Sequence, residues 1–506
     1  MEAAHAGSER VTSVAHEGQS GTGPRVLWTL LILASIGLLA SSVYRAAAFS
    51  FGGDESLSFA IFSWKPYWGR TANNHLLNTA LMRWCSALFG NSELSLRLPN
   101  LAAHGLYLIC VLALVKRVRS PALKVFGFVL LTLNLLLVEY FIVARGYGLA
   151  VAFEMLSLCL FVRACQGAAK GQIARDLYLS VGSGALAVLA NFAWLNFFVP
   201  LVLASAWLLA TDASLRQLNR RRISTTLVLL AGSSLFLSQI LIKLLRLERD
   251  GQLYWGGYTG FVADTIESLA RCSLFPGSDS PAAVKALSIA IIATFLVALP
   301  LGLVQLFTRK GEATFGLLVL LLAGAVALPI VEHHLFHAPF PIERAALYYL
   351  PLYAGVFLYG LDALSALHAE GWKRAVSPIS AIVALAASGC FLGGFAERSS
   401  CAWLRDTHNR EVLAFIDRDR TEQALTRPIK VRTNHHMEPS FNFYRVTRHY
   451  SWLVPVIRKP IPDPDYIYTF ESELSPADRG IILASYADLH TVLLRVHHAA
   501  DADSRR

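Results

Sequence analysis

Long apolar runs recur along most of the chain, separated by short polar connectors. A helix needs about 20 mainly apolar residues to cross about 30 Å of hydrocarbon. Eleven runs fit this requirement: 27–43, 98–115, 123–141, 147–163, 177–190, 194–211, 224–242, 284–307, 314–331, 345–367 and 375–395. Only Asn191, Phe192 and Ala193 separate the fifth run from the sixth, so the two runs could also form one long helix. The polar break favours two separate spans. The pattern predicts an α-helical protein with about eleven membrane spans.

The composition agrees with a membrane protein and excludes an ordinary soluble enzyme. Of the 506 residues, 55% are hydrophobic and 16% are charged, against about 45–50% apolar and about 25% charged in soluble domains. A net charge of +10 would suit a nucleic-acid partner, but most basic residues lie in the connectors, so we predict no nucleic acid. The seven cysteines show neither a disulfide framework nor zinc-ligand spacing.

Lysines and arginines are concentrated in alternate connectors. If the N-terminus is cytoplasmic, the short outer connectors hold only Arg145 and Arg344. The inner connectors hold Arg10, Arg25, Lys116, Arg117, Arg119, Lys124, Arg163, Lys170, Arg175, Arg216, Arg220, Arg221, Arg222, Arg309, Lys310, Lys373 and Arg374. Short loops rich in Lys and Arg stay on the cytoplasmic side. We therefore predict a multi-pass protein of the cytoplasmic (inner) membrane, with its N-terminus inside and its C-terminal region outside.

The chain divides into three parts. Residues 1–24 are polar and rich in Gly and Ser, and we expect a disordered cytoplasmic leader. Residues 25–395 form the transmembrane domain, with long outer loops at 44–97 and 243–283. The remaining residues, 396–506, have charged, alternating segments and Pro-rich breaks, which are typical of a small extracytoplasmic α/β domain.

The first outer loop places two adjacent carboxylates, Asp54 and Glu55, just beyond the first span and directly after two glycines. A carboxylate at this surface can act as a general base toward a hydroxyl; the alternative is a solvated loop acid. The loop continues through a histidine-containing stretch around His75 to Glu93-Leu94-Ser95-Leu96-Arg97-Leu98-Pro99, where the second span opens. We expect Arg97 to hold the loop against this span.

This order of motifs resembles the GT-C superfamily of membrane glycosyltransferases, and most closely the bacterial relatives of the protein O-mannosyltransferases and the lipid A aminoarabinose transferase. The resemblance covers roughly the first 170 residues and extends more loosely to 332–360. It implies sugar transfer from a polyprenyl-phosphate donor to a protein, lipid or polysaccharide on the outer face of the membrane. It also implies Asp54 as the base, Glu55 orienting it or sharing its role, and inversion at the anomeric carbon.

Two further connectors carry candidate substrate ligands. The resemblance implies an acid and an arginine in the connector that contains Glu139 and Arg145. A guanidinium binds phosphate oxygens bidentately, which makes Arg145 and Arg344 candidate phosphate ligands, with His75 and Tyr348 near the donor. The alternatives are a headgroup-level helix-end acid for Glu139 and membrane-interface anchoring for the arginines.

The connector 332–344 also holds His333, His334 and His337 near Glu332, but not in the His-Glu-x-x-His order of a zinc protease. No metal ligand is assigned and no cofactor is certain, although a divalent cation stays open. Glu154 lies inside the fourth span and His104 is a candidate partner for it, because ionisable groups at membrane depth usually have one.

Two other functions fit the same pattern in part. A transporter or flippase for lipid or sugar would also have many spans, but such proteins often have internal repeats, which we do not find. A scaffold of the same fold without catalysis is the third class, and intact Asp54 and Arg145 argue against it. The sequence does not identify the sugar, the acceptor or the carrier length. We expect contact with membrane lipid.

Overall fold

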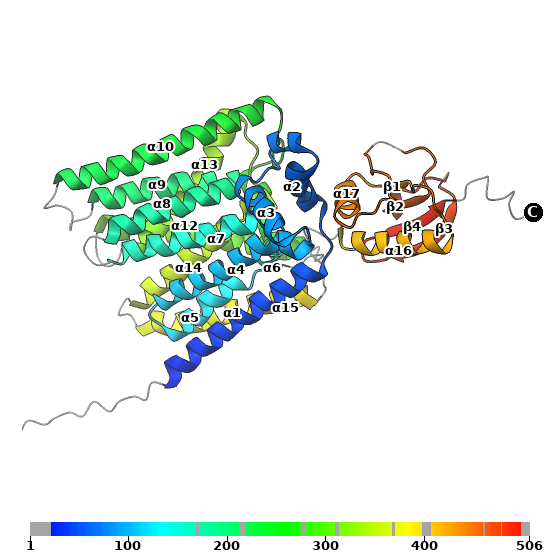
Figure 1. Ribbon diagram of the computed structural model, residues 1–506. Helices are drawn as coiled ribbons and strands as arrows, with labels where there is room; N and C mark the ends of the chain where they lie inside the picture. Colours follow the sequence, from blue (N-terminus) through cyan, green and yellow to red (C-terminus); the bar gives the residue numbers. More distant parts are fainter. Residues whose placement is uncertain are drawn as a thin grey trace, which may run out of the picture.

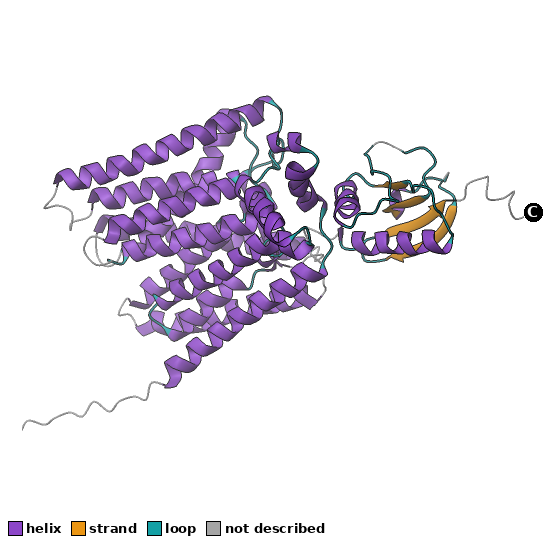
Figure 2. Cartoon of the chain, viewed as in Figure 1, coloured by secondary structure: helices purple, strands orange, loops and turns teal. Residues whose placement is uncertain are grey.

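The computed structural model describes residues 22–167, 172–211, 219–274, 280–308, 313–366, 370–396, 406–458, 461–476 and 478–496. Helices lie side by side in a bundle, and a small domain containing a sheet sits at one end of it (Figures 1 and 2). This arrangement confirms the predicted helical membrane fold with a C-terminal α/β domain. The leader predicted over 1–24 falls mostly outside the described residues, and its last three residues already belong to α1.

Eight helices in the described ranges are long and apolar enough to cross a membrane. They are α1 (Thr22–Ala48), α4 (Glu93–Lys116), α7 (Gly146–Cys165), α8 (Gln172–Ala190), α9 (Leu195–Thr211), α10 (Asn219–Arg249), α12 (Pro281–Thr308) and α13 (Thr314–Phe336). Each coincides with a predicted span. Helices α8 and α9 are separate because the Asn191 side chain accepts a hydrogen bond from the Ala193 amide and starts a new turn.

The other three predicted runs are less regular, so a total of eleven spans stays a prediction. A single helix over 123–141 is wrong: the chain forms α5 (Pro121–Thr132) and α6 (Leu135–Glu139). The break arises at Asn134, whose side chain caps the new helix by accepting from the Leu137 amide. The last two runs correspond to α14 (Tyr349–Ala366), which follows the short helix η5 (Glu343–Ala346), and to α15 (Glu370–Ala396).

The two predicted long loops are largely helical. The first contains α2 (Gly53–Ser63), η1 (Pro66–Arg70) and α3 (Leu76–Phe89), which gather at the end of the bundle nearest the small domain (Figure 1). In the second, α10 runs on to Arg249, and a π-helical turn (Val262–Ile266) leads into α11 (Glu267–Leu274).

The C-terminal domain has one four-stranded sheet in the order β1-β2-β4-β3. Its elements are α16 (Asn409–Glu422), β1 (Val431–Thr433), α17 (Glu438–Thr447), β2 (Tyr466–Phe470), a 3-10 turn (Glu471–Glu473), β3 (Gly480–Tyr486) and β4 (Thr491–Val496). Strand β1 runs parallel to β2, and the other neighbours are antiparallel.

The C-terminal domain shares a hydrophobic core with the first loop. Phe51 stacks on Phe443 of α17 with ring centroids 4.2 Å apart, and Phe59 packs on the same ring edge-on at 5.2 Å. Backbone contacts run through the same junction: the Phe51 amide donates to the Tyr444 hydroxyl, and the Ser440 hydroxyl donates to the Phe51 carbonyl. Helix α2 is therefore fixed by residues almost 400 positions away in the chain.

A buried ion pair joins α2 to α4. Both oxygens of Glu55 accept from Arg97, at 2.8 and 2.6 Å, and each side chain is about 1% exposed. Arg97 also donates to the carbonyls of Ala46, Phe49 and Ser50. The expectation that Arg97 holds the loop against the second span is met by these contacts.

Breaking this pair should destabilise the protein strongly. Arg97→Met leaves the Glu55 charge buried and unpaired, and such losses cost about 3–5 kcal/mol. We expect a correspondingly lower unfolding midpoint for the purified protein in detergent. Arg175→Met is the control, because Arg175 is 62% exposed and its neighbour Asp176 keeps Arg163 as a partner. Equal effects of the two substitutions would contradict the prediction.

Candidate active site

Asp54 lies in the first turn of α2, between two arginines. Its Oδ2 atom is 3.6 Å from Arg145 Nη2 and 3.5 Å from Arg344 Nη1. The Asp54 side chain is 24% exposed, so a reactant can reach it. The two short connectors that were predicted to carry candidate phosphate ligands therefore meet at the predicted base.

Arg145 is almost fully buried at the residue before α7. Its Nη1 donates to the Asp54 carbonyl and to Ser58 Oγ, both at 3.2 Å, and Nη2 donates to Asn73 Oδ1 at 3.0 Å. Its Nε has no hydrogen-bond partner among the described residues. These contacts orient a guanidinium that still has a donor to offer, which distinguishes Arg145 from an interface anchor extended toward water.

Arg344 lies in η5, in the connector between α13 and α14, and also faces Asp54. Its guanidinium carbon lies 4.9 Å from the centre of the Trp255 ring, a cation–π contact. Its buried Nε, like that of Arg145, has no hydrogen-bond partner within the described ranges. The two arginines bring two positive charges to one carboxylate, and this surplus suits a phosphate.

His75 is buried beside this group, immediately before α3. One ring nitrogen, Nδ1, lies 3.1 Å from the Ala190 carbonyl, and in the part of the chain that the structure describes Nε2 has no hydrogen-bond partner. Burial lowers the pKa of His75 well below its usual range, and the charge of Arg145 lowers the pKa further. His75 is therefore neutral at physiological pH and serves as a hydrogen-bonding group rather than a third cation.

Tyr348 lies in a wall of aromatic side chains. Its ring packs on Tyr349 at 4.3 Å and on Trp194 at 5.9 Å between centroids. Tyr147 continues the wall to His75, at 5.1 Å. The predicted residue Tyr348 is thus connected to the Asp54 group through rings rather than by a contact with Asp54 itself.

Glu55 and Glu139 are placed differently from Asp54. Besides Arg97, Glu55 accepts from the amides of Gly52 and Ala144, so both of its oxygens are engaged. This geometry favours a positioning role over a share in catalysis. Glu139 is fully buried and faces Arg45 of α1 at 3.9 Å, in an ion pair separate from Arg145.

Other polar candidates are explained by local contacts. Glu154 accepts from the Trp194 indole at 2.7 Å, whereas His104 stacks on Phe141, so the partner of Glu154 is Trp194 rather than the candidate His104. His333 stacks on Phe340 and its Nδ1 lies 2.8 Å from the Ala338 carbonyl. Throughout the described ranges, no three His, Cys, Asp or Glu side chains come together to hold a metal.

Three residues near the site were not predicted: Ser58, Asn73 and Asp406. Ser58 follows Asp54 by one helical turn, so helical periodicity over 53–63 would have placed it on the same face. Asn73 stands in the stretch that leads to His75. Asp406 accepts from the Gly53 amide at 2.8 Å, and no sequence signal connects positions 353 residues apart.

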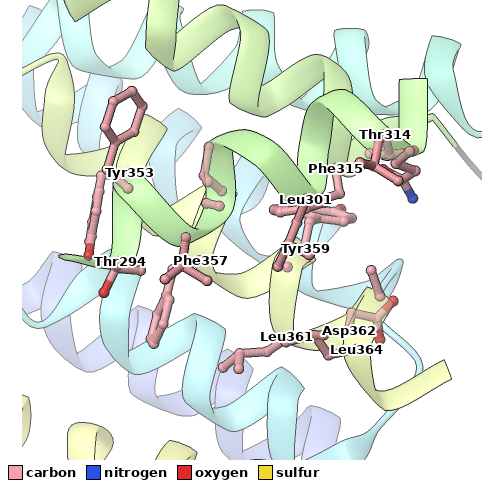
Figure 3. Close-up of a pocket in the computed structure, with 18 of the residues that line it drawn as sticks. Thr294, Leu301, Thr314, Phe315, Tyr353, Phe357, Tyr359, Leu361, Asp362 and Leu364 are labelled. Carbon is pink, nitrogen blue, oxygen red and sulfur yellow. The ribbon is translucent and has the colours of Figure 1, made fainter. Parts of the chain in front are cut away.

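A cavity of about 670 Å³ lies elsewhere in the bundle, between α12, α13 and α14 (Figure 3). Apolar side chains such as Leu301, Phe315 and Phe357 form most of its wall, and the ion pair of Arg119 and Asp362 also lines it. None of the site residues described above lines this cavity, so its volume does not bear on the chemistry at Asp54.

Comparison with known proteins identifies the fold. No family model matches the sequence, and no curated protein matches it. The crystal structure of ArnT from Cupriavidus metallidurans in the apo state matches with a TM-score of 0.52 at 12% identity, covering 93% of this chain and 98% of that one. The same enzyme bound to undecaprenyl phosphate aligns over the same shares with a TM-score of 0.49. This likeness shows an ArnT-like fold, in agreement with the fold that the sequence predicts.

Close packing at Gly146 controls where Arg145 sits. A Cβ atom there would lie 2.0 Å from the Ala190 carbonyl oxygen and 2.8 Å from the His75 Cβ. Gly146→Ala should therefore push α7 away from α3, displace Arg145 and lower stability by about 1–3 kcal/mol.

Thermal unfolding of the purified variants in detergent measures this loss. Gly182→Ala in α8 is the matched control, because no atom lies within 4 Å of the added methyl group. Alanine at that position should be neutral or slightly stabilising. Equal midpoints for the two variants would contradict the packing argument.

Proposed function

We propose that the protein is a glycosyltransferase that moves a sugar from a polyprenyl-phosphate donor to an acceptor hydroxyl. The observation that carries the proposal is the Asp54 carboxylate, held between the guanidinium groups of Arg145 and Arg344 in an ArnT-like fold. A carboxylate and two arginines match the needs of this reaction, in which a hydroxyl loses a proton while a phosphate departs.

The reaction assigns one role to each group. The acceptor oxygen attacks the anomeric carbon and gives its proton to Asp54. The bond from that carbon to the phosphate oxygen breaks, and polyprenyl phosphate leaves with the bonding electrons. Arg145 and Arg344 bind the phosphate and stabilise the charge that develops on it. Attack opposite the leaving group inverts the anomeric centre.

The remaining candidates support these groups. Neutral His75 offers Nε2 as a hydrogen-bonding group without adding charge. Tyr348 is fully buried between Tyr349 and Trp194, so we assign it to supporting the wall of the site rather than to direct contact with the sugar. We assign Glu55 to positioning and Glu139 to holding α6 on α1 through Arg45. No step of the proposal passes through a metal ion.

We also propose that this end of the bundle faces away from the cytoplasm, because Lys116 and Arg163 lie in the last turns of α4 and α7, at the ends of these helices away from Arg97 and Arg145. Alkaline phosphatase, which folds only in an oxidising compartment, is expected to be active when fused after the full chain. The same reporter placed in the connector 117–120 should be inactive. Activity in the reverse order would place the site on the cytoplasmic side and exclude the proposed donor geometry.

Asp54→Asn tests the chemistry directly. Loss of a general base costs about 10²–10⁴-fold in rate, so release of polyprenyl phosphate from radiolabelled polyprenyl-phosphate hexoses and pentoses should fall by that factor. Asp250→Asn is the control, since Asp250 is an exposed acid just beyond α10.

Full transfer by folded Asp54→Asn protein would refute the role of the carboxylate. If the wild type transports a donor lipid without releasing polyprenyl phosphate, the protein is a flippase instead.

A further inference from the structure

The amino end of α2 depends on a carboxylate from the other end of the chain. Asp406 lies just before α16 and is buried. Its Oδ2 accepts from the Gly53 amide at 2.8 Å, and its Oδ1 accepts from Asn409 Nδ2 at 2.7 Å. Gly53 directly precedes Asp54, so Asp406 fixes the peptide from which the proposed base extends.

Free amides at the start of a helix attract any nearby carboxylate. Here, two of them already have partners: Glu55 accepts from the Gly52 amide, and Asp406 accepts from the Gly53 amide. Between these two acids in the same turn, the Asp54 carboxylate lies within 3.6 Å of Arg145 and 3.5 Å of Arg344.

The junction around Asp406 is tight and specific. The Ser50 hydroxyl donates to the Thr407 carbonyl at 2.7 Å, and Arg410 donates to the Ala48 carbonyl at 2.6 Å. A Cβ atom on Gly53 would lie 2.5 Å from the His436 carbonyl oxygen, so the backbone of the C-terminal domain touches α2 directly. Asp406 therefore cannot be displaced without moving the helix that carries Asp54.

We propose that Asp406 is a positioning residue for the transfer reaction, and that the C-terminal domain is thereby an integral part of the active site. This inference rests on the proposed function. Asp406 does not touch the reactants; its ionised form makes a charge-assisted hydrogen bond that holds the first turn of α2 while Asp54 accepts the proton.

The pKa of Asp406 makes this arrangement sensitive to pH. Burial raises the pKa of Asp406 to about 7, the hydrogen bond from Gly53 opposes the rise, and Asp54 adds to it. The titratable groups facing Asp406 are Asp54 and Glu55 of α2 and Tyr468 of β2. Since the folded pKa lies above the usual value of 3.8, the folded state binds the proton more tightly. Stability from this group is therefore lost as pH rises from about 4 to about 7.

Asp406→Asn separates a role in positioning Asp54 for the reaction from a role in stabilising the fold. The neutral amide can be accommodated, because Asn409 Oδ1 is buried without a partner and can accept from it once the Asn409 amide turns over. We therefore expect the variant to gain stability relative to wild type as pH rises from about 4 to about 7. In the same protein, kcat should fall about 10- to 100-fold, the cost of a small displacement of a reacting group, with donor KM within about twofold. Asp406→Glu, which keeps the charge, should recover part of kcat.

Asp419→Asn is the matched control. Asp419 is a buried acid of α16 that accepts from Tyr466 and Arg495, away from α2. It should lower the stability of the domain but leave kcat of the folded protein unchanged. The wild-type rate should rise with pH through about 7, and this limb should be absent in Asp406→Asn. Unchanged kcat and pH profile in Asp406→Asn, or a parallel loss of stability and rate, would overturn the inference.

Amide hydrogen exchange tests the positioning role of Asp406 without any substrate. In the full-length protein at pH 8, amides at 51–57 should exchange several-fold faster in Asp406→Asn than in wild type. In Asp419→Asn, the same amides should exchange at the wild-type rate. Equal rates would overturn the positioning role. If the wild type releases no polyprenyl phosphate from any donor tested, the proposed transfer function fails, while the exchange experiment still decides whether Asp406 holds α2.

Discussion

The buried pair of Glu55 and Arg97 is the interaction on which the site depends. Its two side chains connect four segments: the end of α1 through three carbonyls, the start of α2, the first turns of α4 and the amide of Ala144. Ala144 immediately precedes Arg145. One ion pair therefore fixes both the helix that carries Asp54 and the residue that presents a guanidinium to it. Hydrogen bonds to every carboxylate oxygen reduce the cost of removing these charges from water.

The charge of the site follows from unequal pairing of its acids. Glu55 and Glu139 each have a buried arginine of their own, Arg97 and Arg45. Asp54 meets two arginines, and within the described residues neither arginine's Nε has a hydrogen-bond partner. Neutral His75 adds no charge to this balance. The positive surplus is thus confined to the place where an anionic group would stand next to Asp54.

The sequence predicted the parts of the site better than their arrangement. Hydropathy found the long spans, and the positions of Asp54, Arg145 and Arg344 after or between spans placed them at one end of the bundle. The sequence could not predict which side chains form ion pairs. Asp54 and Glu55 are adjacent in the sequence but point in different directions, because consecutive residues on a helix are separated by about 100°. The break between α5 and α6 at Asn134 could not be predicted from hydropathy, because the residues on both sides of Asn134 are apolar. Asp406 gave no signal, since only the tertiary fold brings it to Gly53.

The core shared by Phe51, Phe59 and Phe443 has a consequence for biosynthesis. The first loop emerges from the ribosome long before the segment that completes its packing, and contacts between such distant positions form late because closing a long loop is entropically costly. The spans can insert one after another, but α2 waits for the final fifth of the polypeptide. Membrane insertion and completion of the site are thus separate events, and the packing around α2 is incomplete until the last domain docks.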